Sequence, residues 1–199
     1  MREAIMDRAA QVDERRGYTV ADFDWLLQMP EYADGKFELI EGEIITMDPV
    51  GFVHGHRATR IARLLDEYAE RTGTGMVTTE TGYYRAGDGE TLLAPDVAFT
   101  RMENLPSPDS EEFVPVMPDL AVEIKSPNDT FAHMRRKAEL YLRRGTQIVW
   151  LVYPERRGVE VCTLQETGEI AREFITEDGS LSGGDALPGF VLELRRLFS

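Results

Sequence analysis

The sequence has a single cysteine and lacks long apolar runs, and its first residues do not resemble a secretory leader. Cys162 alone cannot build a disulfide framework or a CxxC zinc site within one chain, and it fits a reducing compartment. No run of about 18 or more apolar residues is present, so we expect no membrane-spanning helix and no membrane partner. Residues 1–16 are charged and have no apolar centre, which argues against a secretory signal. A cytoplasmic location is therefore expected.

Familiar catalytic and metal-binding signatures are also missing. The chain contains no P-loop and no GxGxxG, GxSxG or HExxH motif. It has three histidines, of which His54 and His56 form an HxH pair just before a predicted helix. A zinc site needs more ligands than two, and none stand nearby at a recognisable spacing, so zinc is not expected.

Positive charge is scarce, since 22 Lys and Arg face 36 Asp and Glu, for a formal net charge of −14. Nucleic-acid binding depends on neutralising phosphates, so a nucleic-acid partner would require a local concentration of basic residues. The densest such run is in the predicted helix 131–145, and its members are Arg135, Arg136, Lys137, Arg143 and Arg144. A solvated helix face explains the same run equally well.

Hydrophobic residues make up 42% of the sequence, which is enough for a hydrophobic core. The length of 199 residues suits one domain. We predict a flexible N-terminal segment over 1–17 and a single domain over 18–199. Periodicity and turn residues predict helices at 19–30, 56–73 and 131–145, a hairpin at 36–47, and strands at 75–87, 92–101, 118–126, 146–154 and 156–164. This order predicts an α/β fold in which helices flank one mixed sheet, preceded by a helix and a β-hairpin.

The segment PDLAVEIKS, residues 118–126, places two charges on one face of an apolar strand. Side chains alternate along a strand, so Leu120, Val122 and Ile124 share the core face, and Glu123 and Lys125 share the opposite face. Buried charges cost several kcal/mol by order of magnitude unless they are paired or bind a metal. By itself the segment is also compatible with a simple ion pair at the end of a sheet.

A second acidic residue interrupts the predicted strand LLAPDVAFTR, residues 92–101. Pro95 has no N–H for the ladder and marks a distortion or an edge, and Asp96 follows it directly. An aspartate that caps a local turn is the alternative interpretation. If the two strands are neighbours, Asp96 converges with Glu123 and Lys125, and two carboxylates with a substrate phosphate suit Mg²⁺. The metal would polarise the phosphate and activate water, while Lys125 orients that water or stabilises the growing charge.

Pro95-Asp96 followed by Glu123-Ile124-Lys125 resembles the PD-(D/E)xK nuclease motif. The likeness extends through FELIEGEI, a histidine before the first long helix, APDVAF, PDLAVEIKSPND, Lys137, Tyr141, Gly145 and IVWLVYP. Over about Tyr18–Cys162 the chain is similar to the bacterial family of putative restriction endonucleases in that superfamily, once known as a domain of unknown function.

The resemblance implies a restriction-endonuclease-like fold and phosphodiester hydrolysis that depends on Mg²⁺, with Mn²⁺ as a substitute. Asp96 and Glu123 match the metal ligands and Lys125 matches the motif lysine. In many members the resemblance places the lysine on the following helix instead, here Lys137, and of the two we favour Lys125. Glu38 in the first hairpin, which alternates with apolar neighbours, fits the family's additional acidic residue.

Further contacts and partners follow from the same resemblance. His54 or His56 matches the family histidine, and Lys137, His54 and Tyr141 are candidate contacts to substrate or phosphate. The expected partner is DNA, and a homodimer is expected because such nucleases often cut two strands with two sites. Two other hypotheses stay open: a nuclease fold kept for binding or regulation without turnover, and an interaction protein in which the charged cluster is a structural ion pair.

Overall fold

The computed structural model describes residues 17–29, 32, 35–107 and 112–199. Residues 1–16 of the predicted flexible segment lie outside the described residues. So does Pro30, the predicted end of the first helix. The helices are α2 (Val20–Leu26), α3 (Phe52–Thr72), α4 (Phe131–Arg144) and α5 (Arg195–Phe198), with 3₁₀ turns η1 (Met102–Asn104) and η2 (Pro154–Arg156). The strands are β1 (Lys36–Ile40), β2 (Glu43–Met47), β3 (Gly75–Thr78), β4 (Val97–Arg101), β5 (Leu120–Ile124), β6 (Ile148–Tyr153), β7 (Gly158–Leu164), β8 (Ile170–Thr176), β9 (Ser180–Ser182) and β10 (Val191–Glu193).

The chain divides into two compact units. The single domain predicted over 18–199 includes residues of both. The first contains the described residues up to Pro49 together with Tyr84–Leu93, and the second contains Val50–Tyr83 and Ala94–Ser199. In the first unit, Thr19 caps α2 in a capping box with Asp22. The predicted hairpin is confirmed as β1 paired antiparallel with β2. Its turn at Glu41 and Gly42 has φ of 51° and 85°, which a tight hairpin turn requires.

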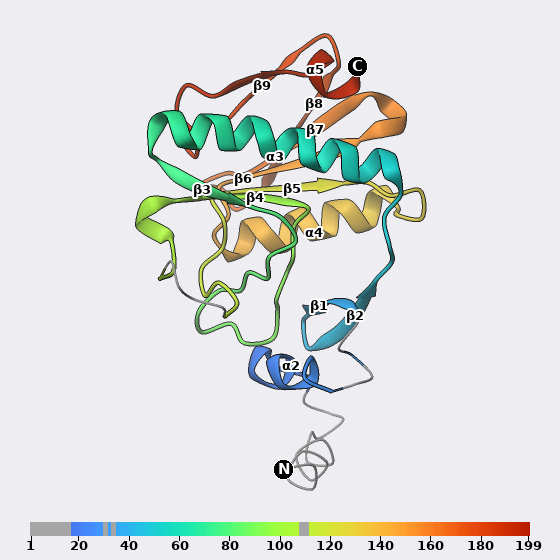
Figure 1. Ribbon diagram of the computed structural model, residues 1–199, viewed down its shortest axis with the longest axis vertical. Helices are drawn as coiled ribbons and strands as arrows, with labels where there is room; N and C mark the ends of the chain where they lie inside the picture. The colour runs from blue at the N-terminus through green and yellow to red at the C-terminus, as the bar shows by residue number, and fades with distance from the viewer. Residues whose placement is uncertain (1–16, 30–31, 33–34, 108–111) are drawn as a thin grey trace, which may run out of the picture. The chain divides into compact units, whose positions relative to one another are not determined.

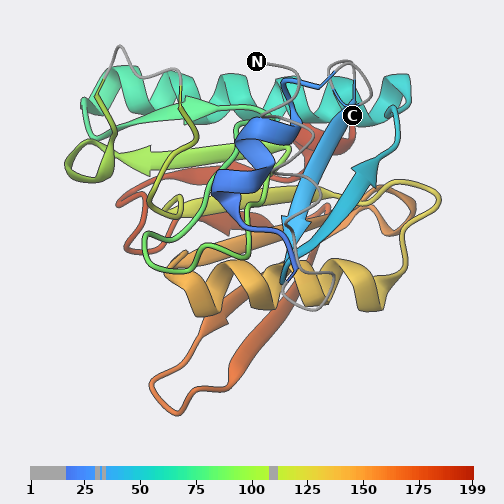
Figure 2. The same cartoon turned by 90° about the horizontal axis from the view of Figure 1, so that it is seen from below.

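The second unit is built on a six-stranded sheet in the order β3-β4-β5-β6-β7-β8. Only β5 and β6 are parallel, and the other neighbours are antiparallel. A parallel pair needs a long crossover, and α4 supplies it. Figures 1 and 2 show α3 on one face of this sheet and α4 on the other. The predicted mixed sheet flanked by helices is confirmed. None of the described helices is long and apolar enough to cross a lipid bilayer.

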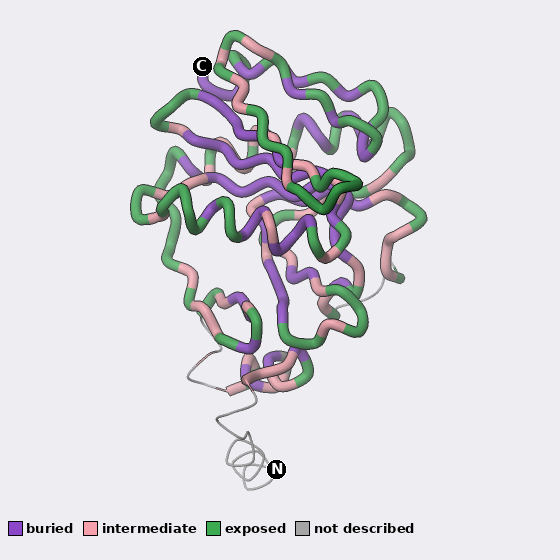
Figure 3. The backbone as a smooth tube through the Cα atoms, turned by 180° about the vertical axis from the view of Figure 1, so that it is seen from behind, coloured by how far each residue is buried: buried purple, intermediate pink, exposed green. Residues whose placement is uncertain are grey.

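The main hydrophobic core lies between the sheet and α3. Leu120, Val122 and Ile124 belong to it, together with residues of α3, β4, β6 and the C-terminal elements. The face predicted for these three side chains is therefore confirmed. Buried residues are concentrated in the central strands (Figure 3). The intervening Glu123 turns to the other face, where α4 packs against β6 and β7.

Several predicted boundaries were wrong; the strand expected over 92–101, for example, begins only at Val97. Helix α3 begins at Phe52, so His54 and His56 lie inside the helix rather than before it. Two glycines, the N-cap Gly51 and the helical Gly55, hid this first turn, because glycine is a poor helix former. The strand expected over 75–87 ends at Thr78, and Glu80 then adopts a positive φ of 53°.

Candidate active site

Two acidic residues lie at neighbouring positions near the end of the central strand pair. In the antiparallel pairing of β4 with β5, Val97 stands opposite Val122 and Ala98 opposite Ala121. Continuing this register by one residue sets Asp96, just before β4, opposite Glu123 near the end of β5. Neighbouring strands lie about 4.8 Å apart, so the chain brings these two residues together although a long loop separates them in sequence.

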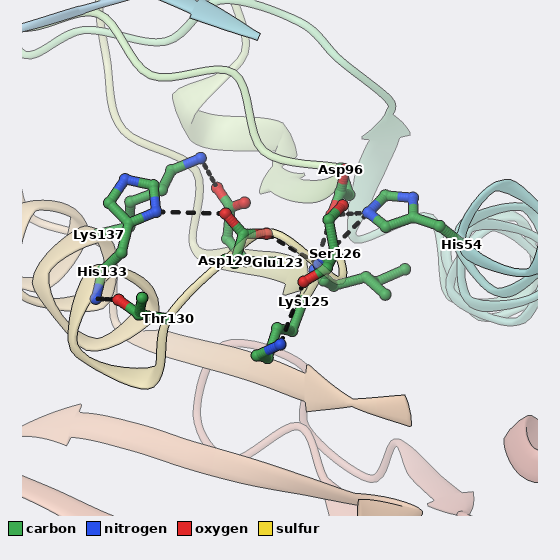
Figure 4. Close-up of polar contacts among 10 residues, drawn as sticks. His54, Asp96, Glu123, Lys125, Ser126, Asp129, Thr130, His133 and Lys137 are labelled. Carbon is green, nitrogen blue, oxygen red and sulfur yellow. Dashed lines mark hydrogen bonds and ion pairs between the residues drawn. The ribbon is translucent and has the colours of Figure 1, made fainter. Parts of the chain in front are cut away.

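Asp96 is tied to β5 through its Oδ2 atom. This oxygen accepts a hydrogen bond of 2.6 Å from the backbone N–H of Ile124 and lies 3.3 Å from Nε2 of His54. The side chain of Asp96 is 12% exposed. Both contacts use Oδ2, and within the described part of the chain Oδ1 takes part in neither of them (Figure 4).

His54 links helix α3 to the same strand end. Its Nε2 lies 2.8 Å from the carbonyl oxygen of Ile124 as well as close to Asp96, and both partners are acceptors, so Nε2 carries a proton. Burial lowers the pKa of His54, but the hydrogen bond to Asp96, the charge of Asp96, the Ile124 carbonyl and the charge of Glu123 together outweigh it. The net result is a pKa raised above its ordinary value of 6.5.

We expect the metal-free protein to lose the stability contributed by His54 as the pH rises. A raised folded-state pKa gives a contribution that is complete below the unfolded value and is lost as pH rises through the folded value. The unfolding free energies of wild type and His54→Asn should therefore differ more at about pH 5 than at about pH 9. An NMR titration of the imidazole measures the pKa itself, and a midpoint at or below 6.5 would contradict the expectation.

Glu123 is held by two side chains from α4. Lys137 Nζ lies 2.8 Å from Oε1, and the Tyr141 hydroxyl donates to the same oxygen at 2.7 Å. Lys137 and Tyr141 are four residues apart and so occupy one face of the helix. Tyr141 is fully buried, and the side chains of Lys137 and Glu123 are 6% and 7% exposed. Tyr141, predicted as a contact to substrate, donates to Glu123 in this structure, and the predicted contact stays a prediction.

Lys125 lies just beyond the end of β5, and its side chain points away from Asp96 and Glu123. Its Nζ is 3.5 Å from Oε1 of Glu155, donates to the carbonyl of Ser126 at 3.1 Å, and lies over the ring of Phe131. Figure 4 shows its side chain leaving the Asp96–Glu123 pair. The structure thus brings Asp96, Glu123, His54, Lys137 and Tyr141 together and does not bring Lys125 to them.

The loop after β5 sets the start of α4. Oδ2 of Asp129 accepts a 2.8 Å hydrogen bond from the N–H of Ser126, and its Oδ1 lies 3.4 Å from Nδ1 of His133. Thr130 caps the helix by accepting from the N–H of His133. These contacts fix the direction in which α4 leaves the strand, and with it the place of Lys137 two turns later.

Glu38 and the basic run on α4 are the remaining predictions from the sequence. Glu38 is buried on β1 of the first unit, and its role as a third metal ligand stays a prediction. The predicted basic run on α4 does not form one free face, because Arg135 pairs with Glu160 and Arg143 with Glu139. Within the described residues, no group of three or more His, Cys, Asp or Glu side chains could hold a metal ion.

A second Pro-Asp pair, Pro118-Asp119, precedes β5 but serves the fold. Asp119 is 3% exposed and accepts from the backbone N–H and Nε of Arg101, both at 2.8 Å, and from Nε2 of Gln147 at 2.8 Å. These bonds occupy both of its oxygens and tie β4, β5 and β6 together at the start of β5. Glu123, by contrast, lies toward the end of the strand.

A mixed sheet with paired carboxylates at two neighbouring strands and a lysine from the following helix defines a protein of the restriction-endonuclease-like class. More narrowly, the chain belongs to the Uma2 family, described as "putative restriction endonuclease", whose model matches residues 23–195. A solved structure titled as a putative nuclease belonging to DUF820, from Anabaena variabilis, has the same fold, with a TM-score of 0.74. The two chains are 22% identical, and the match covers 91% of this chain and 97% of that one. No curated protein matches the chain.

Proposed function

We propose that the protein is a metal-dependent endonuclease that hydrolyses phosphodiester bonds in DNA. One observation carries the proposal: buried Lys137 lies 2.8 Å from Glu123, and the next residue of the same strand, Ile124, donates its N–H to Asp96. Two acids and a lysine held together at the end of a strand pair are the groups that this chemistry needs. The family description, restriction endonuclease, supports DNA as the polymer.

The donor set suits Mg²⁺ or Mn²⁺. Magnesium is commonly held by one or two carboxylates together with waters and substrate phosphate oxygens, so a group of three protein ligands is not needed. Asp96, through Oδ1, and Glu123 would hold the ion. The bound ion would supply charge stabilisation at the phosphate and a more acidic water.

The chain's own residues divide the remaining work. Lys137 orients the attacking water or donates to the charge that grows on the phosphate, a role that a fixed ammonium in a water-poor site performs well. Tyr141 and His54 are positioning residues, because the first bonds Glu123 and the second bonds Asp96 and Ile124. Lys125 is assigned to the periphery with Glu155. A homodimer that cuts both strands stays a prediction.

The test is cleavage of supercoiled plasmid and of single-stranded DNA, with Mg²⁺, with Mn²⁺ and with a chelator. We expect nicking or linearisation with either metal and none with the chelator. Isothermal titration with Mn²⁺ in the absence of DNA measures metal binding separately. Metal binding without cleavage of any nucleic acid would favour the non-catalytic binding protein, which the net charge of −14 also fits. If the protein neither binds metal nor cleaves nucleic acid, the Lys137–Glu123 contact is a structural ion pair.

A further inference from the structure

Asp129 and His133 form an acid–imidazole pair at the start of α4. Oδ1 of Asp129 lies 3.4 Å from Nδ1 of His133. A carboxylate only accepts hydrogen bonds, so Nδ1 carries a proton. The other ring nitrogen of His133, Nε2, has no hydrogen bond or ion pair within the described residues. The imidazole is therefore oriented from one side and open to an incoming molecule on the other.

Helix α4 sets His133 beside the lysine of the candidate active site. His133 precedes Lys137 by four residues, so their side chains share a face, with about 5–6 Å between the Cβ atoms. Figure 4 shows both side chains on the same side of the helix. Helical side chains lean toward the helix N-terminus, so Lys137 reaches along the turn that carries His133 and meets Glu123 at 2.8 Å. The side chain of His133 is 46% exposed and that of Lys137 only 6%, so His133 lies where this face opens to solvent.

A second connection ties the pair to the end of β5. Oδ2 of Asp129 accepts a 2.8 Å hydrogen bond from the N–H of Ser126. Ser126 follows Ile124 by two residues, and the N–H of Ile124 donates to Asp96 at 2.6 Å. The acid of the pair is thus fixed to the strand end that carries the proposed metal ligands, and the imidazole is fixed to the helix turn before Lys137.

The proposed hydrolysis includes one proton transfer to which no residue has yet been assigned. Hydrolysis forms a bond from water to phosphorus and breaks the bond to a sugar oxygen, and that leaving oxygen must take up a proton. Lys137 is assigned to the attacking water or to the charge on the phosphate. The attacking and leaving oxygens lie roughly in line on opposite sides of phosphorus, so one side chain does not serve both. A group one helix turn from Lys137 has the separation that the second role requires.

We propose that His133 is the general acid of the reaction, which donates its Nε2 proton to the leaving sugar oxygen, and that Asp129 positions it. This inference rests on the proposed function and adds a catalytic residue to it. The attacking water releases one proton to solvent, the leaving oxygen takes the Nε2 proton, and solvent returns a proton to the imidazole. Imidazole suits the role because it gains and loses a proton near neutral pH. The 3.4 Å contact with Asp129 is longer than a good hydrogen bond, and such contacts tighten when substrate binds.

The experiment compares a natural DNA oligonucleotide with one in which sulfur replaces the leaving oxygen, both with Mn²⁺. The product ends made by the wild type identify the oxygen that leaves, and the sulfur is placed at that atom. His133→Gln should cleave the natural substrate about 10²- to 10³-fold more slowly, within the range for loss of a general acid. A thiol is a far stronger acid than an alcohol, so a thiolate leaves without a proton. On the sulfur substrate His133→Gln should therefore cleave at nearly the wild-type rate, and Asp129→Asn should show the same pattern with a smaller loss.

Glu139→Gln is the matched control, because Glu139 and Arg143 form an exposed pair with the same four-residue spacing on α4. Glu139 lies two residues from Lys137, on another face of the helix, so this variant should keep the wild-type rate on both substrates. The affinities of His133→Gln for Mn²⁺ and for DNA should equal those of the wild type. An unchanged rate on the natural substrate, equal losses on both substrates, or a loss of affinity alone would overturn the role of His133 and leave the nuclease proposal standing. If the wild type cleaves neither substrate, both proposals fall.

Discussion

Glu123→Gln and Asp96→Asn should each reduce metal-dependent DNA cleavage by roughly 10³-fold or more. A metal ion at the phosphate contributes several kcal/mol of charge stabilisation in the transition state, and each ~1.4 kcal/mol corresponds to a factor of ten. Both changes keep the shape of the side chain and remove the charge. The amide introduced by Glu123→Gln retains an oxygen that can accept from Lys137 and Tyr141, so the protein should still fold. Plasmid cleavage under single-turnover conditions measures the loss, and Mn²⁺ titration should show weakened metal binding.

Glu160→Gln is the matched control for this pair. Glu160 is a carboxylate on β7 that is 4% exposed and bonded to Arg135 at 2.6 Å and 2.9 Å. It lies in the same row of the sheet as Glu123, with Leu151 of β6 between them. Its neutralisation should lower the melting temperature and leave the cleavage rate per folded molecule unchanged. Equal losses of cleavage in all three variants would show that buried charge in general, rather than this pair, is being measured.

Lys137→Gln should lower the cleavage rate by about 10²- to 10³-fold, the range for removing one donor aimed at developing charge. Lys125→Gln should change the cleavage rate by less than about threefold. The partner of Lys125 is the exposed Glu155 rather than Glu123, and an exposed ion pair contributes little. The Lys137→Gln change keeps a neutral donor near Glu123 and loses only the ammonium. The two variants are compared at saturating metal, where the ion compensates the charge of Glu123.

The comparison of these two lysines decides which one belongs to the catalytic centre. Thermal melting identifies any part of the Lys137→Gln effect that comes from loss of the buried ion pair, since removing one partner of such a pair can cost about 3–5 kcal/mol. Lys137→Arg keeps the charge and should restore a measurable part of the rate. A large loss in Lys125→Gln with normal cleavage by Lys137→Gln would return the role to the motif lysine.

Much of the sheet could be predicted because strand periodicity is a local property. Alternation in PDLAVEIKS correctly separated Leu120, Val122 and Ile124 from Glu123, since successive side chains must point to opposite faces. The apolar run 146–154 correctly indicated a strand covered on both faces, as every residue of β6 is buried. Boundaries were less predictable where glycine intervened, as at the start of α3.

Lys125 shows where the same reasoning ends. Alternation places it on the face of Glu123 only while the strand continues, and β5 ends at Ile124. Beyond that point the long side chain follows the loop toward Glu155 and Phe131. The four-residue spacing of Lys137 and Tyr141 was a usable signal in the sequence, because it puts both on one helical face, but it does not say which strand that face meets.

By itself the sequence determined the α/β class and the family resemblance and made Asp96 and Glu123 the candidate acids, because periodicity, turn residues and a short motif are all encoded locally. Tertiary structure decided the register that sets those acids opposite each other, and the crossing of α4 that brings Lys137 rather than Lys125 to Glu123. The physical reason is the limited length of a side chain, which can interact only with groups that lie a few ångströms from its own backbone. Which backbones come that close depends on how strands pair and helices pack, and no local pattern specifies it.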